Sequence, residues 1–320
     1  MDFSKDILNL KCKDTADNIQ TFIKNQVYYN FKKKGAVIGI SGGIDSALTT
    51  ALCVNALGAE NVIGVKLPEK ESNPCSIDFA KLQADQVGIK TYYFDITPVL
   101  NSFNVYERKN EIIKNIFPEF KEDMKYRLIL PQNLLDKDRF NVYSLEIQVE
   151  PGKIISKYIN AKDYREIVAL TSIKQRSRMV LLYYVAEKNN FLVAGTTNKT
   201  EYLQGFFVKY GDGGVDIEPL ASLYKTQVFE LAKYLNVPEE IVKRKPSPDT
   251  FSLEVSDTEF YHCIPFEKLD LLLYAYDNQI DISKIKSELG LEESQIKRAF
   301  SDFDRKRKIT EHFRHLPPTP

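Results

Sequence analysis

The sequence predicts an α/β protein with a doubly wound, Rossmann-like parallel sheet and a helical C-terminal region. Short apolar runs alternate with segments of helical periodicity over the first part of the chain. A glycine-rich polar loop, Ser41-Gly42-Gly43-Ile44-Asp45-Ser46, joins the first apolar run to a helical segment. The last third of the chain returns to helical periodicity. Strand, tight loop and helix in this order are the building unit of a parallel sheet.

Each expected element rests on its own pattern. Residues 14–34 place Ile19, Phe22, Ile23, Val27 and Phe31 at helical spacing, which predicts a helix packed on the sheet. The apolar run 36–40 predicts the first strand, and residues 47–52 belong to the helix after the loop. Further strands are expected at 61–68, 91–95 and 191–196, and further helices at 77–87 and 174–188. Ligands of such sheets bind beyond the carboxyl ends of the strands.

Residues 104–165 interrupt this alternation. They are charged and rich in tyrosine, and Pro118, Pro131 and the turn Pro151-Gly152 divide them. A structureless segment of this length is unusual, so we expect short helices and a hairpin near 143–149. Helices then follow at 225–235, 266–275, 282–289 and 292–308. We expect one domain over residues 1–320, with 104–165 as an insertion.

Composition excludes several classes of protein. The chain has 320 residues, 43% of them hydrophobic, and its 44 basic side chains balance 44 acidic ones, so no basic field indicates a nucleic-acid partner. The four cysteines show no Cys-x-x-Cys pairing and only three histidines accompany them, so we expect free thiols and no zinc site. Neither a signal peptide nor an apolar run of about 20 residues is present. We therefore expect a soluble, cytoplasmic protein with no membrane partner.

The loop at 41–46 has the chemistry of a phosphate site. Its glycines let the backbone turn and approach a ligand, and its free N–H groups adjoin the positive end of a helix. Asp45 adds a carboxylate able to hold Mg²⁺. The loop lacks the Gly-Lys-Ser/Thr ending of a Walker A motif and the third glycine of a dinucleotide fingerprint. An ordinary Gly-rich turn is the alternative, but the full hexapeptide after a strand favours phosphate.

The pattern Ser-Gly-Gly-x-Asp-Ser resembles the pyrophosphatase (PP) loop of ligases that split ATP between its α and β phosphates. A longer string supports a narrower resemblance: it comprises residues 195–201, 205–220, 223–228 and 245–249, with the helix Arg176-Ser177-Arg178-Met179 and the ending Glu311-His312-Phe313-Arg314. It resembles the NAD synthetase family, of the ammonia-dependent type. The resemblance implies an adenine nucleotide alpha-hydrolase fold and a ligase that amidates deamido-NAD with ammonia through an acyl-adenylate, giving NAD, AMP and pyrophosphate.

The same resemblance assigns site residues. It gives catalytic roles to Asp45 and Lys225, and the metal Mg²⁺ to Asp45 and Glu201. It assigns binding of the acceptor nucleotide to Arg176, Lys209, Asp216 and His312. It assigns binding of ATP to Gly39, Ile40, Ser41, Gly42, Gly43, Ile44, Asp45, Ser46, Thr196, Lys225 and Ser247. Considered alone, each of these residues has a simpler interpretation. Lys225 could be a solvated surface charge, Glu201 a residue favoured at a helix start, and Lys209 and Asp216 turn residues.

The chain departs from the family pattern in four places. They are residues 250–261, the pair His312-Phe313, the helix Ser172–Met179 and the insertion at 104–165. All four bear on the acceptor side, so a related ligase acting on a different carboxylic acid is an alternative. A tRNA-modifying enzyme with the same loop, supported only by the basic run Lys306-Arg307-Lys308, and a non-catalytic nucleotide-binding protein are weaker alternatives.

The resemblance also bears on organisation and partners. About 35 residues precede the first expected strand, too few for a glutaminase domain, so free ammonia is the expected nitrogen source unless a separate subunit supplies it. Short members of this family look like homodimers, which we expect here. For the insertion we consider a lid over the adenylate, a partner-docking element and a dimer contact.

Overall fold

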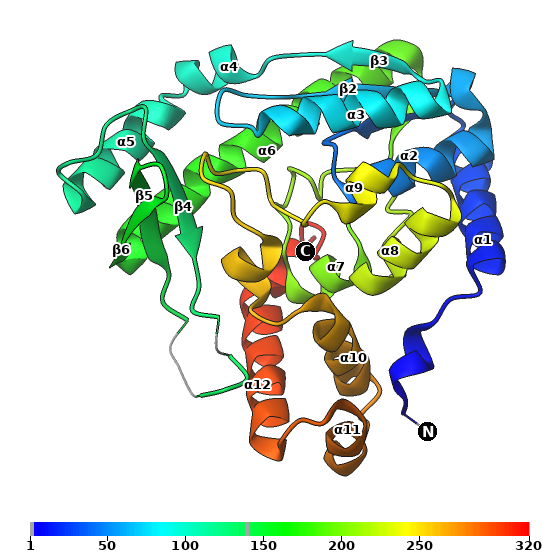
Figure 1. The fold of residues 1–320 in the computed structure, drawn as a ribbon. Coiled ribbons are helices and arrows are strands. Elements are labelled where there is room, and N and C mark those ends of the chain that lie inside the picture. The colour runs from blue at the N-terminus through cyan, green and yellow to red at the C-terminus, as the bar shows by residue number, and fades with distance from the viewer. Residues whose placement is uncertain (1–2, 133, 138–140, 320) are drawn as a thin grey trace.

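A computed structural model describes residues 3–132, 134–137 and 141–319 (Figure 1). Its central sheet has four strands in the order β3-β2-β1-β7, all parallel. The strands are β1 (Ala36–Gly39), β2 (Val62–Lys66), β3 (Lys90–Tyr93) and β7 (Leu192–Val193). All four expected strands are therefore present and shorter than predicted, and β7 keeps only two residues of the strand expected at 191–196. The strand order reverses beside β1, which is where a doubly wound sheet binds its ligands.

The alternation of side chains along each strand divides the core into two layers. In β1, Ala36 and Ile38 pack with one apolar cluster while Val37 packs with another. The first layer is covered by α1 (Cys12–Lys24), α2 (Ile44–Leu57) and α8 (Lys225–Tyr234), with part of α3 (Pro74–Val87). The second layer is covered by α4 (Thr97–Ser102), α5 (Val105–Ile116) and α6 (Ala161–Asn189). Both faces of the sheet are thus buried, as parallel strands require.

The helix expected at 14–34 is shorter than predicted. The α-helix α1 ends at Lys24 and continues as a π-helical turn over Asn25–Asn30. The apolar positions Ile19, Ile23 and Val27 stay buried, whereas Phe22 and Phe31 are exposed. The wider spacing of the π turn rotates the later apolar residue away from the core.

The insertion forms a small sheet of its own. Strands β4 (Lys125–Ile129), β5 (Ser144–Glu150) and β6 (Lys153–Tyr158) pair antiparallel in that order. Figure 1 shows this sheet beside α5 and the first turns of α6, at one edge of the molecule. Its apolar face, including Leu128, Leu145 and Ile147, packs with Ile113 of α5 and Ile167 of α6. The hairpin expected near 143–149 is confirmed as β5–β6, but the strand β4 was not predicted.

The long helix α6 corrects the expected boundary of the insertion. It begins at Ala161, before the predicted limit of 165 and well before the helix start predicted at 174. Asn160 caps it by accepting hydrogen bonds from the N–H groups of Lys162 and Asp163. The helix contributes to two separate apolar clusters along its length, so it lacks one continuous apolar stripe.

The C-terminal region is helical, as expected. It comprises α7 (Lys199–Gln204), α9 (Glu239–Lys243), α10 (Phe266–Asp277), α11 (Ile282–Leu289) and α12 (Glu293–Thr310), with α8 between α7 and α9. Helices α10–α12 enclose a fourth apolar cluster, which Phe3 and Leu8 of the N-terminal segment complete. Of the helices in the described part of the chain, none is both long and apolar enough to cross a bilayer.

Candidate active site

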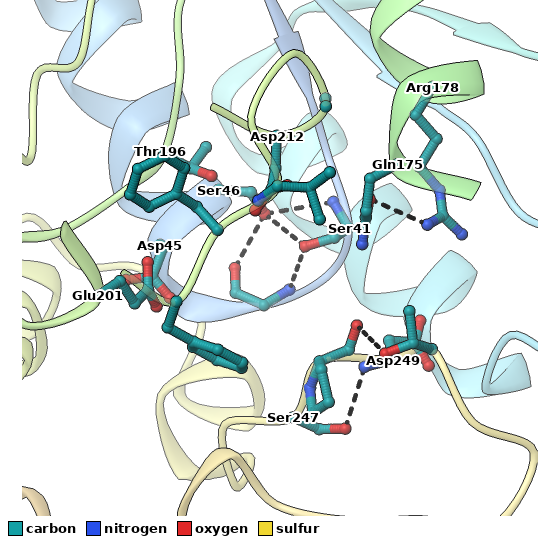
Figure 2. Close-up of a pocket in the computed structure, with 18 of the residues that line it drawn as sticks. Ser41, Asp45, Ser46, Gln175, Arg178, Thr196, Glu201, Asp212, Ser247 and Asp249 are labelled. Atoms are coloured by element: carbon teal, nitrogen blue, oxygen red, sulfur yellow. Dashed lines mark hydrogen bonds between the residues drawn. The ribbon is translucent and has the colours of Figure 1, made fainter. Parts of the chain in front are cut away.

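The polar loop between β1 and α2 is held in shape by its own serines (Figure 2). Ser46 Oγ donates to Gly43 O at 3.0 Å, the Ser41 N–H donates to Ser46 Oγ at 3.3 Å, and the Gly43 N–H donates to Ser41 Oγ at 3.2 Å. Gly42 has φ +75°, and a Cβ there would lie 2.4 Å from Ser76 O. This loop conformation therefore requires glycine, and it presents backbone N–H groups at the start of a 14-residue helix.

A buried lysine joins two carboxylates beside this loop. Lys225 Nζ lies 2.5 Å from Asp45 Oδ2 and 3.3 Å from Glu201 Oε1, and the lysine side chain is 1% exposed. Asp45 lies in the first turn of α2 and Glu201 in the first turn of α7. Figure 2 shows the two carboxylates side by side. The structure thus brings together three of the expected catalytic and metal-binding residues, and Lys225 is not a solvated surface charge.

Asn198 fixes the relative position of these carboxylates. Its Nδ2 donates to Asp45 Oδ1 at 2.9 Å, and its Oδ1 accepts from the Glu201 N–H at 3.0 Å. The Asn198 N–H donates to Glu201 Oε2 at 3.3 Å, which closes a capping box at the start of α7. Asn198 was not predicted as a site residue, although the pattern Asn-x-x-Glu after a strand is a recognisable helix start.

The charges of the cluster shift one another's proton affinities. Burial of the Lys225 ammonium opposes ionisation, but Asp45 and Glu201 outweigh it, so the pKa of Lys225 is raised. Burial raises the pKa of Glu201 to about 8, with Lys225 opposing the rise. Burial also raises the pKa of Asp257, on the same cavity wall, to about 6. The acidic groups outnumber the one ammonium, which gives the site an attraction for a further cation.

These residues fit the magnesium ion that the resemblance implies. Mg²⁺ usually takes one or two protein carboxylates and completes its shell with water and substrate phosphates. Asp45 and Glu201 provide two such carboxylates, both facing one cation already, the ammonium of Lys225. Within the described residues, no group of three or more His, Cys, Asp and Glu side chains forms a ready metal cage. A metal held here would therefore depend on substrate oxygens.

A third segment, residues 246–252, closes the cavity opposite the loop. Asp249 Oδ1 accepts from the Asn73 N–H at 3.0 Å, and its Oδ2 accepts from Ser76 Oγ at 2.9 Å. Arg244 donates to Gly42 O at 3.2 Å and to Ser76 Oγ at 2.9 Å. Figure 2 shows Ser247 beside Asp249 on this side. Arg244 and Asp249 therefore join the polar loop, the start of α3 and the third segment, and neither was predicted.

These elements surround a cavity of about 580 Å³. Its volume is within the usual range for small-molecule sites. The predicted residues that line it are Gly39, Ile40, Ser41, Gly43, Ile44, Asp45, Ser46, Arg176, Thr196, Glu201, Lys209, Lys225 and Ser247. Gly42 is not on this wall, since its backbone faces α3.

The acceptor side is less well assembled. Arg176 Nε donates to Lys209 O at 3.3 Å, and Lys209 Nζ donates to the carbonyl oxygens of His312 and His315 at 2.9 and 2.8 Å. Arg178, which is half-buried, also lines the cavity, with Nε donating to Leu67 O at 3.0 Å. The basic side chains of Arg176 and Lys209, at one end of the cavity, can bind an anionic group.

Two of the expected acceptor residues lie outside the cavity. Asp216 accepts from Tyr183 OH of α6 at 3.1 Å and from the Val193 N–H at 2.8 Å, so its two oxygens link α6 to the end of β7. The side chain of His312 is exposed, and only its carbonyl oxygen reaches Lys209. Within one chain, the structure does not support the predicted substrate contacts of these two residues. Phe313 lines the cavity in place of His312.

Comparison with known proteins identifies the family of this chain. A family profile described as NAD synthase matches residues 15–128 and 121–317. The chain is 39% identical over 316 residues to the NH(3)-dependent NAD(+) synthetase of Rhizobium meliloti (strain 1021), covering 99% of this chain and 94% of that protein. It is 38% identical over 268 residues to the protein of the same name from Thermotoga maritima, covering 83% of this chain and 88% of that protein.

Solved structures share the fold. The NMN synthetase of Francisella tularensis matches with a TM-score of 0.65 at 22% identity, covering 98% of this chain and 99% of that one. The NH3-dependent NAD synthetase of Campylobacter jejuni matches with a TM-score of 0.63 at 23% identity, covering 97% and 99%. The family match extends over both segments that build the cavity, the polar loop and residues 195–249. The chain therefore belongs to the NAD synthase family.

Proposed function

We propose that the protein amidates deamido-NAD with ammonia at the expense of ATP, releasing NAD, AMP and pyrophosphate. One observation supports this proposal most directly. Asp45, Glu201 and Lys225 converge beside a glycine-rich loop at the carboxyl end of β1, within one cavity. Relatives named NH(3)-dependent NAD(+) synthetase cover nearly the whole chain, which adds independent support.

The chemistry follows from what the residues can bind. The acceptor carboxylate attacks the α-phosphorus of ATP, the bond to the β-phosphate oxygen breaks, and pyrophosphate leaves. Loop N–H groups at 41–46 and the ammonium of Lys225 stabilise the charge that develops on the departing group. Ammonia then attacks the acyl carbon, gives up a proton, and displaces AMP. Because AMP is a good leaving group, this step depends mainly on positioning.

Asp45 and Glu201 would hold Mg²⁺ together with substrate oxygens, and the ion would supply neutralisation of phosphate charge. Lys225 has a second task in this scheme. It holds the two carboxylates together before the nucleotide enters, since its ammonium contacts both. Thr196 and Ser247 add hydroxyls on opposite walls of the cavity.

A different acceptor acid is the second candidate. Phe313, part of one of the departures from the family pattern, lines the cavity, and Asp216 and His312 lie outside the wall. A smaller or less charged acid than deamido-NAD would need fewer of these contacts. A panel of acids, including nicotinate mononucleotide, separates the two candidates.

The test measures products directly. Purified protein is incubated with ATP, Mg²⁺ and ammonium, with and without each acid, and NAD, AMP and pyrophosphate are quantified. Acid-dependent release of AMP and pyrophosphate with deamido-NAD as the preferred acid supports the leading proposal. Preference for another acid supports the second candidate, and release of ADP contradicts both.

We also propose that the active form is a homodimer that pairs through α6. Val180 and Tyr184 are 60% and 52% exposed, and they share one helix face with Arg176 at i, i+4 and i+8 spacing. Pairing along this face buries apolar surface and brings Arg176 to the interface. Light scattering should give twice the chain mass, and Val180→Glu should give a monomer. A monomeric wild type contradicts the proposal.

No disulfide joins the cysteines of the described residues. Their state suits the reducing cytoplasm in which we propose that the protein works.

A further inference from the structure

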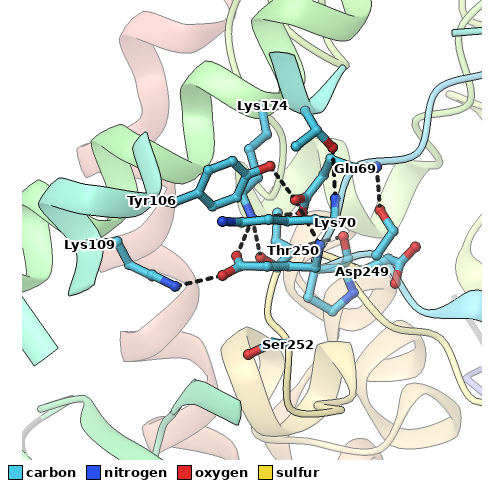
Figure 3. A network of polar contacts seen from close by, with 12 residues as sticks. Glu69, Lys70, Tyr106, Lys109, Lys174, Asp249, Thr250 and Ser252 are labelled. Carbon is cyan, nitrogen blue, oxygen red and sulfur yellow. Dashed lines mark hydrogen bonds and ion pairs between the residues drawn. The ribbon is translucent and has the colours of Figure 1, made fainter. Parts of the chain in front are cut away.

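A cluster of buried charges lies where the insertion meets the body of the protein (Figure 3). We call it the Lys174 network; its members are Glu69, Glu71, Tyr106, Lys109, Tyr126 and Lys174. Lys174 Nζ lies 2.8 Å from both Glu69 Oε1 and Glu71 Oε2. Lys109 Nζ lies 2.6 Å from Glu71 Oε1, and Tyr106 OH donates to Glu69 Oε2 at 2.6 Å.

The network is fully enclosed and balanced in charge. The side chains of Lys174 and Glu69 are 2% and 0% exposed. Two ammonium groups face two carboxylates, and every carboxylate oxygen accepts at least one hydrogen bond. Burial opposes ionisation of Glu71, but Lys174 and Lys109 outweigh it, so its pKa lies below the usual range. A buried ion-pair network is weak evidence for stability, because desolvation offsets much of the attraction between its charges. What these contacts provide is a fixed geometry.

That geometry concerns two segments of the cavity wall. Glu69 and Glu71 belong to the loop between β2 and α3, in which Pro68 and Ser72 line the cavity. Lys174 Nζ also donates to Thr250 O at 3.1 Å, and Thr250 lines the opposite wall segment. One ammonium therefore ties the loop 68–73 to the segment 246–252.

The insertion contacts both segments from outside. Lys109 and Tyr106 of α5 hold Glu71 and Glu69 in the first segment. In β4, the Tyr126 N–H donates to Ser252 Oγ at 3.0 Å and the Leu253 N–H donates to Tyr126 O at 2.9 Å, which hold the second. Figure 3 shows Lys109 and Tyr106 reaching the cluster from the side of α5, with Thr250 and Ser252 beneath it.

We propose that the insertion is a brace for the nucleotide cavity, and that Lys109, Tyr106 and Lys174 are positioning residues for ATP. They act through Glu69, Glu71 and Thr250 on the two wall segments. This role rests on the proposed function. It differs from that of a lid, which would cover the opening and make its contacts only with ligand present.

Lys109→Met tests the brace, because Lys109 does not line the cavity. The apparent KM for ATP should rise about tenfold, while kcat changes less than about twofold. Backbone amides of residues 69–73 and 249–253 should exchange hydrogen at least about tenfold faster. Tyr106→Phe, which removes one hydroxyl at nearly constant volume, should shift the same two quantities by about threefold.

Two further variants separate positioning from general stability. Lys157→Met removes a lysine of the same insertion that contacts Ile116 O and the Phe117 ring, and it should leave the KM for ATP unchanged. The double variant Lys109→Met with Glu71→Gln restores charge balance but not the contact between these residues, so its KM for ATP should stay raised; recovery of the wild-type KM would assign the effect to unbalanced charge and overturn the brace. The brace is overturned if Lys109→Met and Lys157→Met lower Tm equally and do not differ from each other in the KM for ATP or in the rates of amide exchange.

The failure of the proposed function would look different. A wild type that releases no pyrophosphate from ATP with any acid overturns the proposed reaction. In that case, comparing amide hydrogen exchange in Lys109→Met and Lys157→Met still tests the brace, because hydrogen exchange requires no turnover.

Discussion

Lys225→Met should remove the one ammonium that separates Asp45 from Glu201. The side chain has a similar length, so the change removes charge with little change in volume. In the wild type this ammonium is 1% exposed and contacts both carboxylates. The variant leaves those carboxylates facing each other without a counter-charge.

The expected magnitude follows from their burial. Removing one partner of a buried ion pair costs about 3–5 kcal/mol. Asp45 and Glu201 are 18% and 17% exposed toward the cavity, so water relieves part of the penalty. We therefore expect the free energy of unfolding to fall by about 3 kcal/mol at neutral pH, at the low end of that range. Loss of a positioned charge in the transition state should lower the rate of pyrophosphate release about 10²–10³-fold.

The stability deficit should depend on pH. Burial raises the pKa of Glu201 and Lys225 opposes that rise, so without the ammonium the pKa of Glu201 in the folded protein lies further above its unfolded value and protonation favours the folded state. The deficit should therefore shrink as pH falls toward 5 and grow as pH rises toward 8. The freed carboxylates should also bind Mg²⁺ in the absence of nucleotide, so Mg²⁺ alone should raise Tm more in the variant than in the wild type.

Urea unfolding at pH 5.5 and 7.5, Tm with and without Mg²⁺, and pyrophosphate release form the assay. Lys233→Met, an exposed lysine of the same helix, is the matched control and should change none of these quantities. A Lys225→Met protein that releases pyrophosphate within about fivefold of wild type would refute the assignment of Lys225. An equal stability deficit at both pH values would refute the electrostatic argument.

Three further predictions address other parts of the cavity. Gly42→Ala places a Cβ at φ +75° and 2.4 Å from Ser76 O. The variant should therefore lower the free energy of unfolding by at least about 1–2 kcal/mol and weaken ATP binding. Unchanged ATP binding in calorimetry would contradict the assignment of the loop to phosphate. Burial raises the pKa of Glu218 from 4.5 to about 8, so the folded protein holds this proton where the unfolded chain loses it. Its contribution to stability should fall as pH rises from about 5 to about 8, and Glu218→Gln should flatten that fall in urea titrations; parallel profiles would show that Glu218 is not the group responsible. Arg176→Lys keeps the charge but loses the bidentate fork, so the KM for the acceptor should rise about tenfold with the KM for ATP unchanged; an equal rise in both would place Arg176 on the ATP side.

The parallel sheet was predictable because its signals are local. The strands β1, β2, β3 and β7 are short apolar runs whose flanking helices repeat at helical spacing, and each lies where expected. The antiparallel strand β4 was missed because its five residues pair with β5, on the far side of a 14-residue connection, and carry little pattern of their own. The start of α6 was missed because the helix packs against two clusters and shows no single apolar stripe.

The sequence by itself determined the phosphate loop, the places of the four parallel strands along the chain and part of the cavity wall, because turn glycines and periodicity act between near neighbours. Only the tertiary structure decided which distant groups meet. Lys225 and Asp45 are 180 positions apart, and their contact depends on how α8 and α2 cross. The same packing turned Asp216 to the end of β7 and enclosed Lys174 between two wall segments. Side-chain direction and crossover geometry are properties of the folded chain, and no short window of residues encodes them.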